Sequence, residues 1–205
     1  DDCMNVAGTS TVDRSGCPDT DGDGYSDPDS GWNVGNGADA FPNEPTQWAD
    51  QDSDGYGDNP LGIEPDGCPV SPGTSTLDRF GCGDGDGDGY SDPDGGWPVA
   101  SGADFCPTVS GTSNQDRSGC PDDDGDGISN LKDAFPNDPN RSQDTDGDGF
   151  DDLEDNCITV AGSSTTDRLG CPDSDGDGYS DVTLPSDNNL GWDVSDGADA
   201  FPLEP

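Results

Sequence analysis

The stretch from Asp144 to Asp155 reads DTDGDGFDDLED and decides how this chain folds. Its aspartates occupy positions 1, 3, 5, 9 and 12 of a loop, with glycine at position 6 and Phe150 at position 7. Alternating short carboxylates in an irregular backbone can turn several oxygens onto one hard cation. The glycine permits a sharp turn, and the position 7 carbonyl adds a ligand. The stretch therefore predicts a calcium-binding loop.

The pattern occurs six times in 205 residues. Positions 1, 3 and 5 always carry aspartate, and these candidate ligands are Asp19, Asp21, Asp23, Asp50, Asp52, Asp54, Asp84, Asp86, Asp88, Asp122, Asp124, Asp126, Asp144, Asp146, Asp148, Asp173, Asp175 and Asp177. Position 7, expected to offer its carbonyl, is Tyr25, Tyr56, Tyr90, Ile128, Phe150 or Tyr179. Position 9 is Asp27, Asp58, Asp92, Asn130, Asp152 or Asp181. An acidic disordered tract has no reason to keep glycine and the apolar residue in phase, so recurrence favours calcium binding.

Position 12 is an acid in two uninterrupted loops, where it is Asp133 or Asp155. In three other loops a tryptophan-containing insertion intervenes, over residues 31–42, 96–107 and 191–202. The strict position 12 of these loops is Ser30, Gly95 or Leu184, which are not anionic ligands. We expect each insertion to loop out and a later acid to close the ion site, namely Asp39, Asp104 or Asp199. In the remaining loop Asp66 is expected to do so, because it precedes Cys68 as Asp155 precedes Cys157.

The composition excludes several classes of protein. The net charge is −41, and hydrophobic residues make up 26 % of the chain. Glycine and proline number 32 and 18, so a conventional core is not available and metal ions and disulfides must stabilise the fold. Strong negative charge argues against nucleic acids and anionic membrane surfaces as partners. No apolar run is long enough to predict membrane insertion.

Eight cysteines form four pairs that are each 14 residues apart. Equal spacing in four similar segments favours four local disulfides, Cys3–Cys17, Cys68–Cys82, Cys106–Cys120 and Cys157–Cys171. Zinc thiolate sites are the disfavoured alternative, because the chain has no histidine and no C-x-x-C motif. Closing a loop of this length stabilises a thin-cored chain by about 3 kcal/mol. Disulfides and calcium loops together indicate an extracellular location, secreted or at the cell surface.

The disulfide-closed segments, here called clips, end in Asp-Arg-x-Gly-Cys. Four arginines share this position, and we expect their guanidinium groups to bridge carboxylates of their own or a neighbouring loop: Arg14, Arg79, Arg117 and Arg168. Ser/Thr clusters in the middle of each clip fit either O-linked sugar or turn chemistry.

No window of the sequence shows helical periodicity, and glycine or proline interrupts nearly everywhere. The predicted fold is mostly irregular coil with little regular secondary structure, and any short strands are expected at the tryptophan insertions. A single repeat array over residues 1–205, with blocks 1–67, 68–105, 106–156 and 157–205, is expected to wind round a line of ions as an elongated calcium wire.

The clip from Cys3 to Cys17 with the acidic loop after it, and the stretch from Asp144 to Cys157, resemble the thrombospondin type-3 repeat family, especially the spacers of bacterial and archaeal surface proteins. The resemblance covers nearly the whole chain except the insertions. It implies a calcium-filled structure without a regular core, one or two ions per loop (about six to twelve in all), disulfides within each clip and an extracellular spacer role. The insertions and the displaced position 12 acids depart from the family pattern.

These observations favour a calcium-rigidified structural rod or filament subunit. The alternative is an adhesion module in which Trp32, Trp97 and Trp192 bind a glycan or a protein. Calcium storage or mineral nucleation would differ mainly in affinity. An enzyme is not expected, because the chain has no histidine and a single lysine. The chain begins and ends within the repeat pattern, which predicts either a segment of a longer array or end-to-end self-association.

Overall fold

The computed structural model describes residues 2–182 and 192–204. The chain divides into two compact units, Asp1–Pro121 and Asp122–Pro205. The boundary lies between the third clip and the acidic loop that follows it. The predicted interruption of the last acidic loop, with Leu184 at its position 12, lies outside the described residues.

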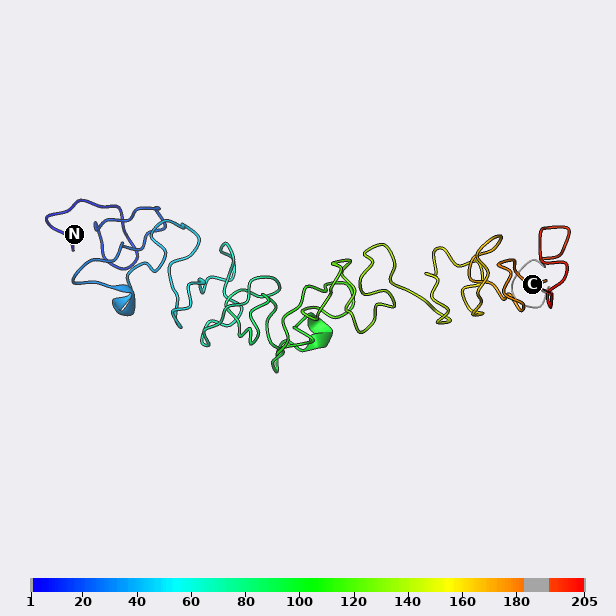
Figure 1. Ribbon diagram of the computed structural model, residues 1–205. Coiled ribbons are helices and arrows are strands. Elements are labelled where there is room, and N and C mark those ends of the chain that lie inside the picture. The colour runs from blue at the N-terminus through cyan, green and yellow to red at the C-terminus, as the bar shows by residue number, and fades with distance from the viewer. Residues whose placement is uncertain (1, 183–191, 205) are drawn as a thin grey trace. The chain divides into compact units, whose positions relative to one another are not determined.

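Regular secondary structure is almost absent, as predicted for a mostly irregular chain (Figure 1). The described residues contain two 3-10 turns, η1 at Val34–Asn36 and η2 at Val99–Ser101, and no α-helix or β-strand. None of their helices is long and apolar enough to cross a membrane.

The short strands predicted at the insertions are wrong for the first two insertions. Each forms a 3-10 turn that ends at a glycine with positive φ, 106° at Gly37 and 113° at Gly102. Such a turn curls the backbone back at once, so no extended run is left to pair with a neighbour. Isolated bridges occur elsewhere, between Gly57 and Pro65 and between Asp66 and Phe80.

The interior of the described residues is polar. Its buried apolar side chains are only cysteines and alanines, namely Cys17, Ala38, Cys82, Ala103, Cys120, Cys171 and Ala198. The largest side chains below 2 % exposure include Gln47, Asp39 and Asp104, whereas Leu61 is 91 % exposed. Hydrophobic burial therefore supplies little of the stability, and buried polar groups need specific partners.

The four predicted disulfides are confirmed, with Cα atoms 5.0–5.1 Å apart in each pair. Each clip wraps round a buried serine, which is Ser10, Ser75, Ser113 or Ser164. In the first clip the Ser10 hydroxyl donates to the Arg14 carbonyl and accepts the Cys17 amide at 2.9 Å. The central serines therefore serve turn chemistry, because a buried hydroxyl with these partners cannot carry a sugar.

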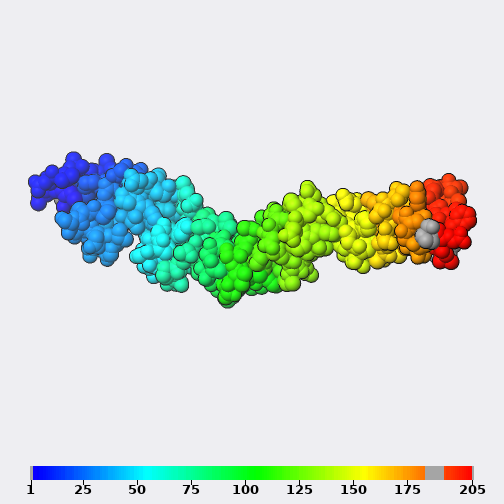
Figure 2. All heavy atoms as spheres, in the orientation of Figure 1, coloured from blue at the N-terminus to red at the C-terminus, as the bar shows by residue number. Residues whose placement is uncertain are grey.

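Each clip is joined to the acidic loop that follows it. In the first repeat the amides of Thr11 and Val12 both donate to the Gly24 carbonyl at 2.9 Å. Asp13 accepts the amide and hydroxyl of Ser26, at 2.9 and 2.5 Å. Within residues 2–121 the colours in Figure 2 follow one another in chain order, in keeping with this packing of sequence neighbours on one another. Local contacts of this kind are typical of repeat proteins.

Candidate metal centres

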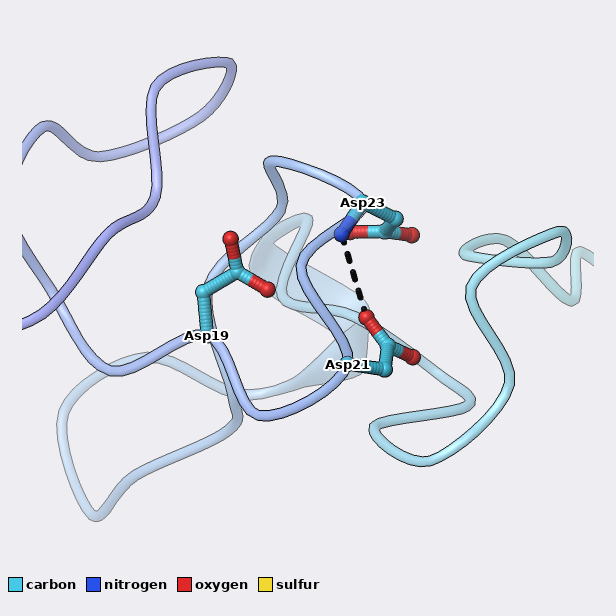
Figure 3. Close-up of side chains that lie close together, drawn as sticks. All are labelled: Asp19, Asp21 and Asp23. Atoms are coloured by element: carbon cyan, nitrogen blue, oxygen red, sulfur yellow. Dashed lines mark hydrogen bonds between the residues drawn. The ribbon is translucent and has the colours of Figure 1, made fainter.

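The acidic loops, named here by their first aspartate, place three carboxylates on one tight turn. In the Asp19 loop (Figure 3), Asp19 accepts the Gly22 amide at 2.7 Å, and Asp21 Oδ1 accepts the Asp23 amide at 3.2 Å. Asp23 Oδ1 accepts the Tyr25 amide at 2.8 Å. One oxygen from each of the three aspartates lies within 4.8 Å of the others. The backbone thus holds the carboxylates around one small volume.

The same geometry recurs along the chain. Position 1 accepts the position 4 amide at 2.6–2.8 Å in every loop, in the pairs Asp19–Gly22, Asp50–Ser53, Asp84–Gly87, Asp122–Gly125, Asp144–Gly147 and Asp173–Gly176. Position 5 accepts the position 7 amide at 2.7–2.9 Å in every loop. Aspartates 1, 3 and 5 cluster within 4.8 Å in the Asp50, Asp84, Asp122 and Asp144 loops also. The sequence pattern thus corresponds to one repeated local structure.

The acids predicted to close the loops all make the same backbone hydrogen bond. Each donates its backbone amide to the position 8 carbonyl at 2.8–3.0 Å, in the pairs Asp39–Ser26, Asp66–Gly57, Asp104–Ser91, Asp133–Ser129, Asp155–Asp151 and Asp199–Ser180. Asp133 and Asp155 stand at position 12 of uninterrupted loops. Because Asp39 and Asp104 make the same contact after an insertion, those insertions leave the loop and return to it.

Four of the six closing acids have one oxygen held by a backbone amide and one without a hydrogen-bond partner among the described residues. Asp39 Oδ1 accepts the Phe41 amide at 2.8 Å, while its Oδ2 is buried and has no hydrogen-bond partner among the described residues. The closing acids with the same arrangement are Asp66, Asp104 and Asp133. Positions 3 and 5 add further buried oxygens without partners, in Asp21, Asp23, Asp52, Asp86, Asp124, Asp146 and Asp175. Buried anionic oxygens without partners are costly, so these residues fit a hard divalent cation, which would complete them.

Position 9 makes a different contact. Asp27 accepts the Thr20 amide at 3.0 Å and the Thr20 hydroxyl at 2.6 Å, so position 2 braces both of its oxygens. The equivalent pairs are Asp152 with Thr145 and Asp181 with Ser174. In these three loops the position 9 carboxylate therefore ties the end of the turn to its start, a contact that the sequence pattern did not predict.

Burial, and to a lesser extent repulsion by neighbouring carboxylates, raises the pKa of the closing acids Asp39, Asp66 and Asp104. The pKa of Asp39 is raised to about 7, chiefly by burial and also by the carboxylates of Asp23, Asp21 and Asp27, against the lowering effect of the hydrogen bond from Phe41. Burial and acids at the same loop positions raise the pKa of Asp66 and Asp104 to about 6. A bound divalent cation would offset this repulsion.

These pKa values predict how the metal-free chain responds to pH. A carboxyl whose pKa is higher in the folded than in the unfolded state, near 3.9, binds its proton more tightly when folded. Without calcium, the folded form should therefore gain stability as the pH falls from about 8 towards 5. We expect the hydrodynamic radius in calcium-depleted buffer to decrease over this range. A radius that is constant or larger at pH 5 would contradict the prediction.

The clip arginines and the insertion tryptophans pack against each other. Arg14 lies 5.3 Å from the centre of the Trp32 ring and forms a 2.8 Å ion pair with Asp29. The Trp32 indole donates to Asp13 at 3.1 Å. In the second insertion Arg79 lies over the Trp97 ring and pairs with Asp94, and the Trp97 indole donates to Asp78. In the third insertion Arg168 lies over the Trp192 ring, and the indole donates to Asp167. The insertion tryptophans thus fasten each insertion to its clip.

The arginine prediction is therefore partly corrected. Arg14 and Arg79 do bind carboxylates of the following loop, but each clip arginine also lies over an aromatic ring, including Arg117 over Phe105. A planar guanidinium stacks on an aromatic face while its edge remains available to an acceptor, so one residue serves both contacts.

The Asp144 loop follows a proline-containing spacer instead of a clip, and Arg141 of this spacer makes the contact that a clip makes in other loops. Its guanidinium donates to the Gly149 carbonyl at 2.7 Å and lies 3.8 Å from the centre of the Phe135 ring. Gly149 is position 6, the acceptor that clip amides use in the Asp19, Asp84 and Asp173 loops. At position 8 the loop has Asp151 instead of serine, and Asp151 accepts the Ser142 amide at 3.0 Å. The spacer thus supports its loop by a different set of donors.

Replacing Arg141 should loosen this loop. In Arg141→Ala the Gly149 carbonyl loses a charged donor and Phe135 loses its cation, a combined loss of about 2 kcal/mol. We expect the amides of residues 147–152 to exchange hydrogen roughly tenfold faster or more. Lys132→Ala, at an exposed cation in the same unit, is the matched control. Equal exchange in the two variants would exclude the supporting role.

The chain matches no protein-family model, and a search of curated proteins gives no match. The functional conclusion therefore depends on the geometry of the loops and clips.

Proposed function

We propose that this protein is a calcium-stabilised, disulfide-clipped structural rod that works outside the cell, as a segment or subunit of a cell-surface or secreted filament. The arrangement that supports it best is the repeated loop, in which aspartates at positions 1, 3 and 5 lie close together and the position 3 aspartate keeps a buried oxygen without a partner among the described residues. In this proposal bound ions take the place of a hydrophobic core, since the buried apolar residues in the described part of the chain are only cysteine and alanine.

Calcium is the ion that this donor set fits. The donors are carboxylates on an irregular loop, with backbone carbonyls nearby, which suits the six to eight oxygen ligands of calcium. Magnesium requires a stricter octahedron and keeps its water, while zinc prefers nitrogen or sulfur. The chain has no histidine, and its eight cysteines are all in disulfides. This chemistry also agrees with the resemblance to thrombospondin type-3 repeats.

Contacts between sequence neighbours support the proposed rod shape. The clip after the Asp84 loop donates its Gly111 amide to Asp88 Oδ2 at 3.0 Å, and the clip after the Asp50 loop contacts Asp54 in the same way through Gly73. A clip therefore binds the loop before it as well as the loop after it. In this proposal successive loops and clips extend in one direction, because each repeat packs on its neighbours rather than on a shared core.

The four disulfides support an oxidising environment for the protein. The extracellular location and end-to-end association with other copies are parts of the proposal. Calcium loops and disulfides both suit an extracellular location.

Calorimetric titration with calcium and magnesium, together with small-angle scattering, tests the proposal. We expect about six or more calcium ions per chain, weaker magnesium binding and an elongated particle in calcium. Light scattering at increasing protein concentration would show end-to-end association. Binding of fewer than three ions, or a compact spherical particle in calcium, would refute the rod.

A further inference from the structure

The proline-containing spacer before the Asp144 loop, residues 134–143, holds a short motif that neither the loops nor the clips explain. Asn140, Arg141 and Ser142 form the pattern N-x-S with a residue other than proline in the middle. This is the acceptor pattern for N-linked sugar, which needs an exposed asparagine. No other asparagine of the sequence is followed two residues later by serine or threonine. Because a pattern of three residues also occurs by chance, its structural setting decides what it can do.

Asn140 lies at the tip of a β-turn. The Arg141 amide donates to the Asp138 carbonyl at 3.0 Å and closes the turn over Pro139 and Asn140. Asn140 is exposed. Among the described residues its Nδ2 atom has one hydrogen-bond partner, Asp138 Oδ1 at 3.4 Å, which is a long and weak contact. The backbone therefore holds the turn, and the side-chain nitrogen of Asn140 can be substituted without opening it.

The two residues after Asn140 fasten the motif to the Asp144 loop. The Arg141 guanidinium donates to the Gly149 carbonyl at 2.7 Å. The Ser142 amide donates to Asp151 at 3.0 Å. Neither contact involves the Asn140 side chain, so a bulky group on Asn140 would stand on a fixed turn and would displace nothing that supports the loop.

The spacer before the Asp50 loop shows what would block such a group. There Thr46 takes the place of Asn140 in an equivalent turn. The Thr46 carbonyl accepts Asn59 Nδ2 at 2.8 Å, and its hydroxyl accepts the Ile63 amide at 2.9 Å. Asn59 and Ile63 belong to the residues that the Asp50 loop inserts before its closing acid, Asp66. The Asp144 loop closes at position 12 without these residues, so Asn140 remains uncovered.

We propose that Asn140 carries an N-linked glycan. In the transfer, Asn140 Nδ2 forms a bond to the anomeric carbon of a lipid-linked sugar donor. The bond from that carbon to the donor's phosphate oxygen breaks, the lipid phosphate leaves with the electron pair, and one Nδ2 proton passes to a base of the transferring enzyme. The glycan rests on the proposed extracellular location, because this enzyme acts on chains that are exported.

Peptide mapping of the full chain, secreted by cultured insect cells, tests the acceptor. Trypsin cleaves after Lys132 and Arg141, so Asn140 lies in the peptide 133–141. We expect this peptide to gain the mass of a glycan, and an N-glycan-releasing amidase to remove that mass and leave aspartate at position 140. Asn140→Gln and Ser142→Ala should both lose the glycan. Ser142→Ala leaves the asparagine and the backbone amide at position 142 in place, so it tests the motif itself.

Asn137→Gln is the matched control, because Asn137 is an exposed asparagine of the same peptide outside the motif, and this variant should keep the glycan. An unmodified Asn140 on the secreted chain would overturn the proposal, as would a glycan that persists in Ser142→Ala. Mapping of protein from its native source separates the glycan from the rod. A bare Asn140 on protein recovered outside the cell would overturn the glycan alone, whereas protein found only inside the cell would refute the location and the glycan together.

Discussion

Removing calcium while all four disulfides stay intact will expand the chain and expose it to proteases. We expect the radius of gyration to rise towards, but remain below, the roughly 50 Å of an unfolded chain of 205 residues, because the clips shorten it. The rate of proteolysis should increase on the order of a hundredfold. Small-angle scattering and limited proteolysis, each with and without chelator, measure the two effects.

The size of this effect follows from what the ions replace. A site at a calcium concentration of 100 times its dissociation constant stabilises the folded form by about 2.7 kcal/mol, so six sites contribute about 16 kcal/mol. That exceeds the net stability of an ordinary domain, about 5–15 kcal/mol. The described interior contains no buried leucine, isoleucine, valine or phenylalanine to offset the loss. Without the ions the clustered carboxylates also repel one another.

Reducing the disulfides in saturating calcium is the matched control. Each clip contributes about 3 kcal/mol through loop closure, so we expect partial loosening around the clips while ions remain bound. Reduction and chelation together should give the most expanded chain. If chelation leaves the scattering profile and protease resistance unchanged, then the disulfides and hydrogen bonds alone hold the fold, and the calcium-stabilised rod is wrong.

The sequence predicted the local parts of this molecule better than their connections. The regular spacing of aspartate and glycine identifies each loop. Asp66 precedes Cys68 as Asp155 precedes Cys157, and this comparison identifies Asp66 as the closing acid of its loop. In each loop the backbone amide of the closing acid donates to the position 8 carbonyl. Comparison of the repeats can locate the residue that makes this hydrogen bond even where an insertion precedes it. Equal spacing likewise sufficed for the disulfides, because a clip is a local structure.

What the sequence did not predict depends on contacts between segments. The insertions contain valine and tryptophan, which favour strands, but turns ending at Gly37 and Gly102 leave those strands no partner. Arg141 does not belong to the clip motif, so its role at Gly149 appears only when the spacer is seen beside the loop. Tyr25 of the Asp19 loop stacks on Trp48, which lies in the spacer before the Asp50 loop, and the two rings line one groove.

Gly119→Ala should disable the Asp84 site, although Gly119 belongs to the following clip and carries no ligand. A Cβ atom built on Gly119 would lie 2.2 Å from Asp104 Oδ1 and 3.0 Å from Asp88 Oδ2. Real Cβ atoms do not make a 2.2 Å contact, so either the closing acid or the clip must move. Asp104 has less than 1 % exposure and holds its Oδ1 on the Cys106 amide at 2.7 Å, which leaves it little freedom.

Gly87→Ala separates this clash from the cost of backbone conformation. The φ angles of Gly119 and Gly87 are similar, +76° and +82°, but a Cβ at Gly87 meets nothing within 4 Å. Gly87→Ala should therefore cost only the left-handed conformation, about 1–2 kcal/mol, and retain its calcium. We expect Gly119→Ala to lose about one ion from the calorimetric stoichiometry and at least 3 kcal/mol of stability.

The equivalent glycines Gly81 and Gly170 lie against the closing acids Asp66 and Asp155, with Cβ distances of 2.5 and 2.2 Å. Alanine at either position should remove the ion from the loop before its clip, as at Gly119. If Gly119→Ala and Gly87→Ala lose equal stability and both keep every ion, the clip does not cover the preceding site. If only Gly119→Ala loses an ion, a glycine that supplies no metal ligand determines metal binding, because it lets the clip close over the ion.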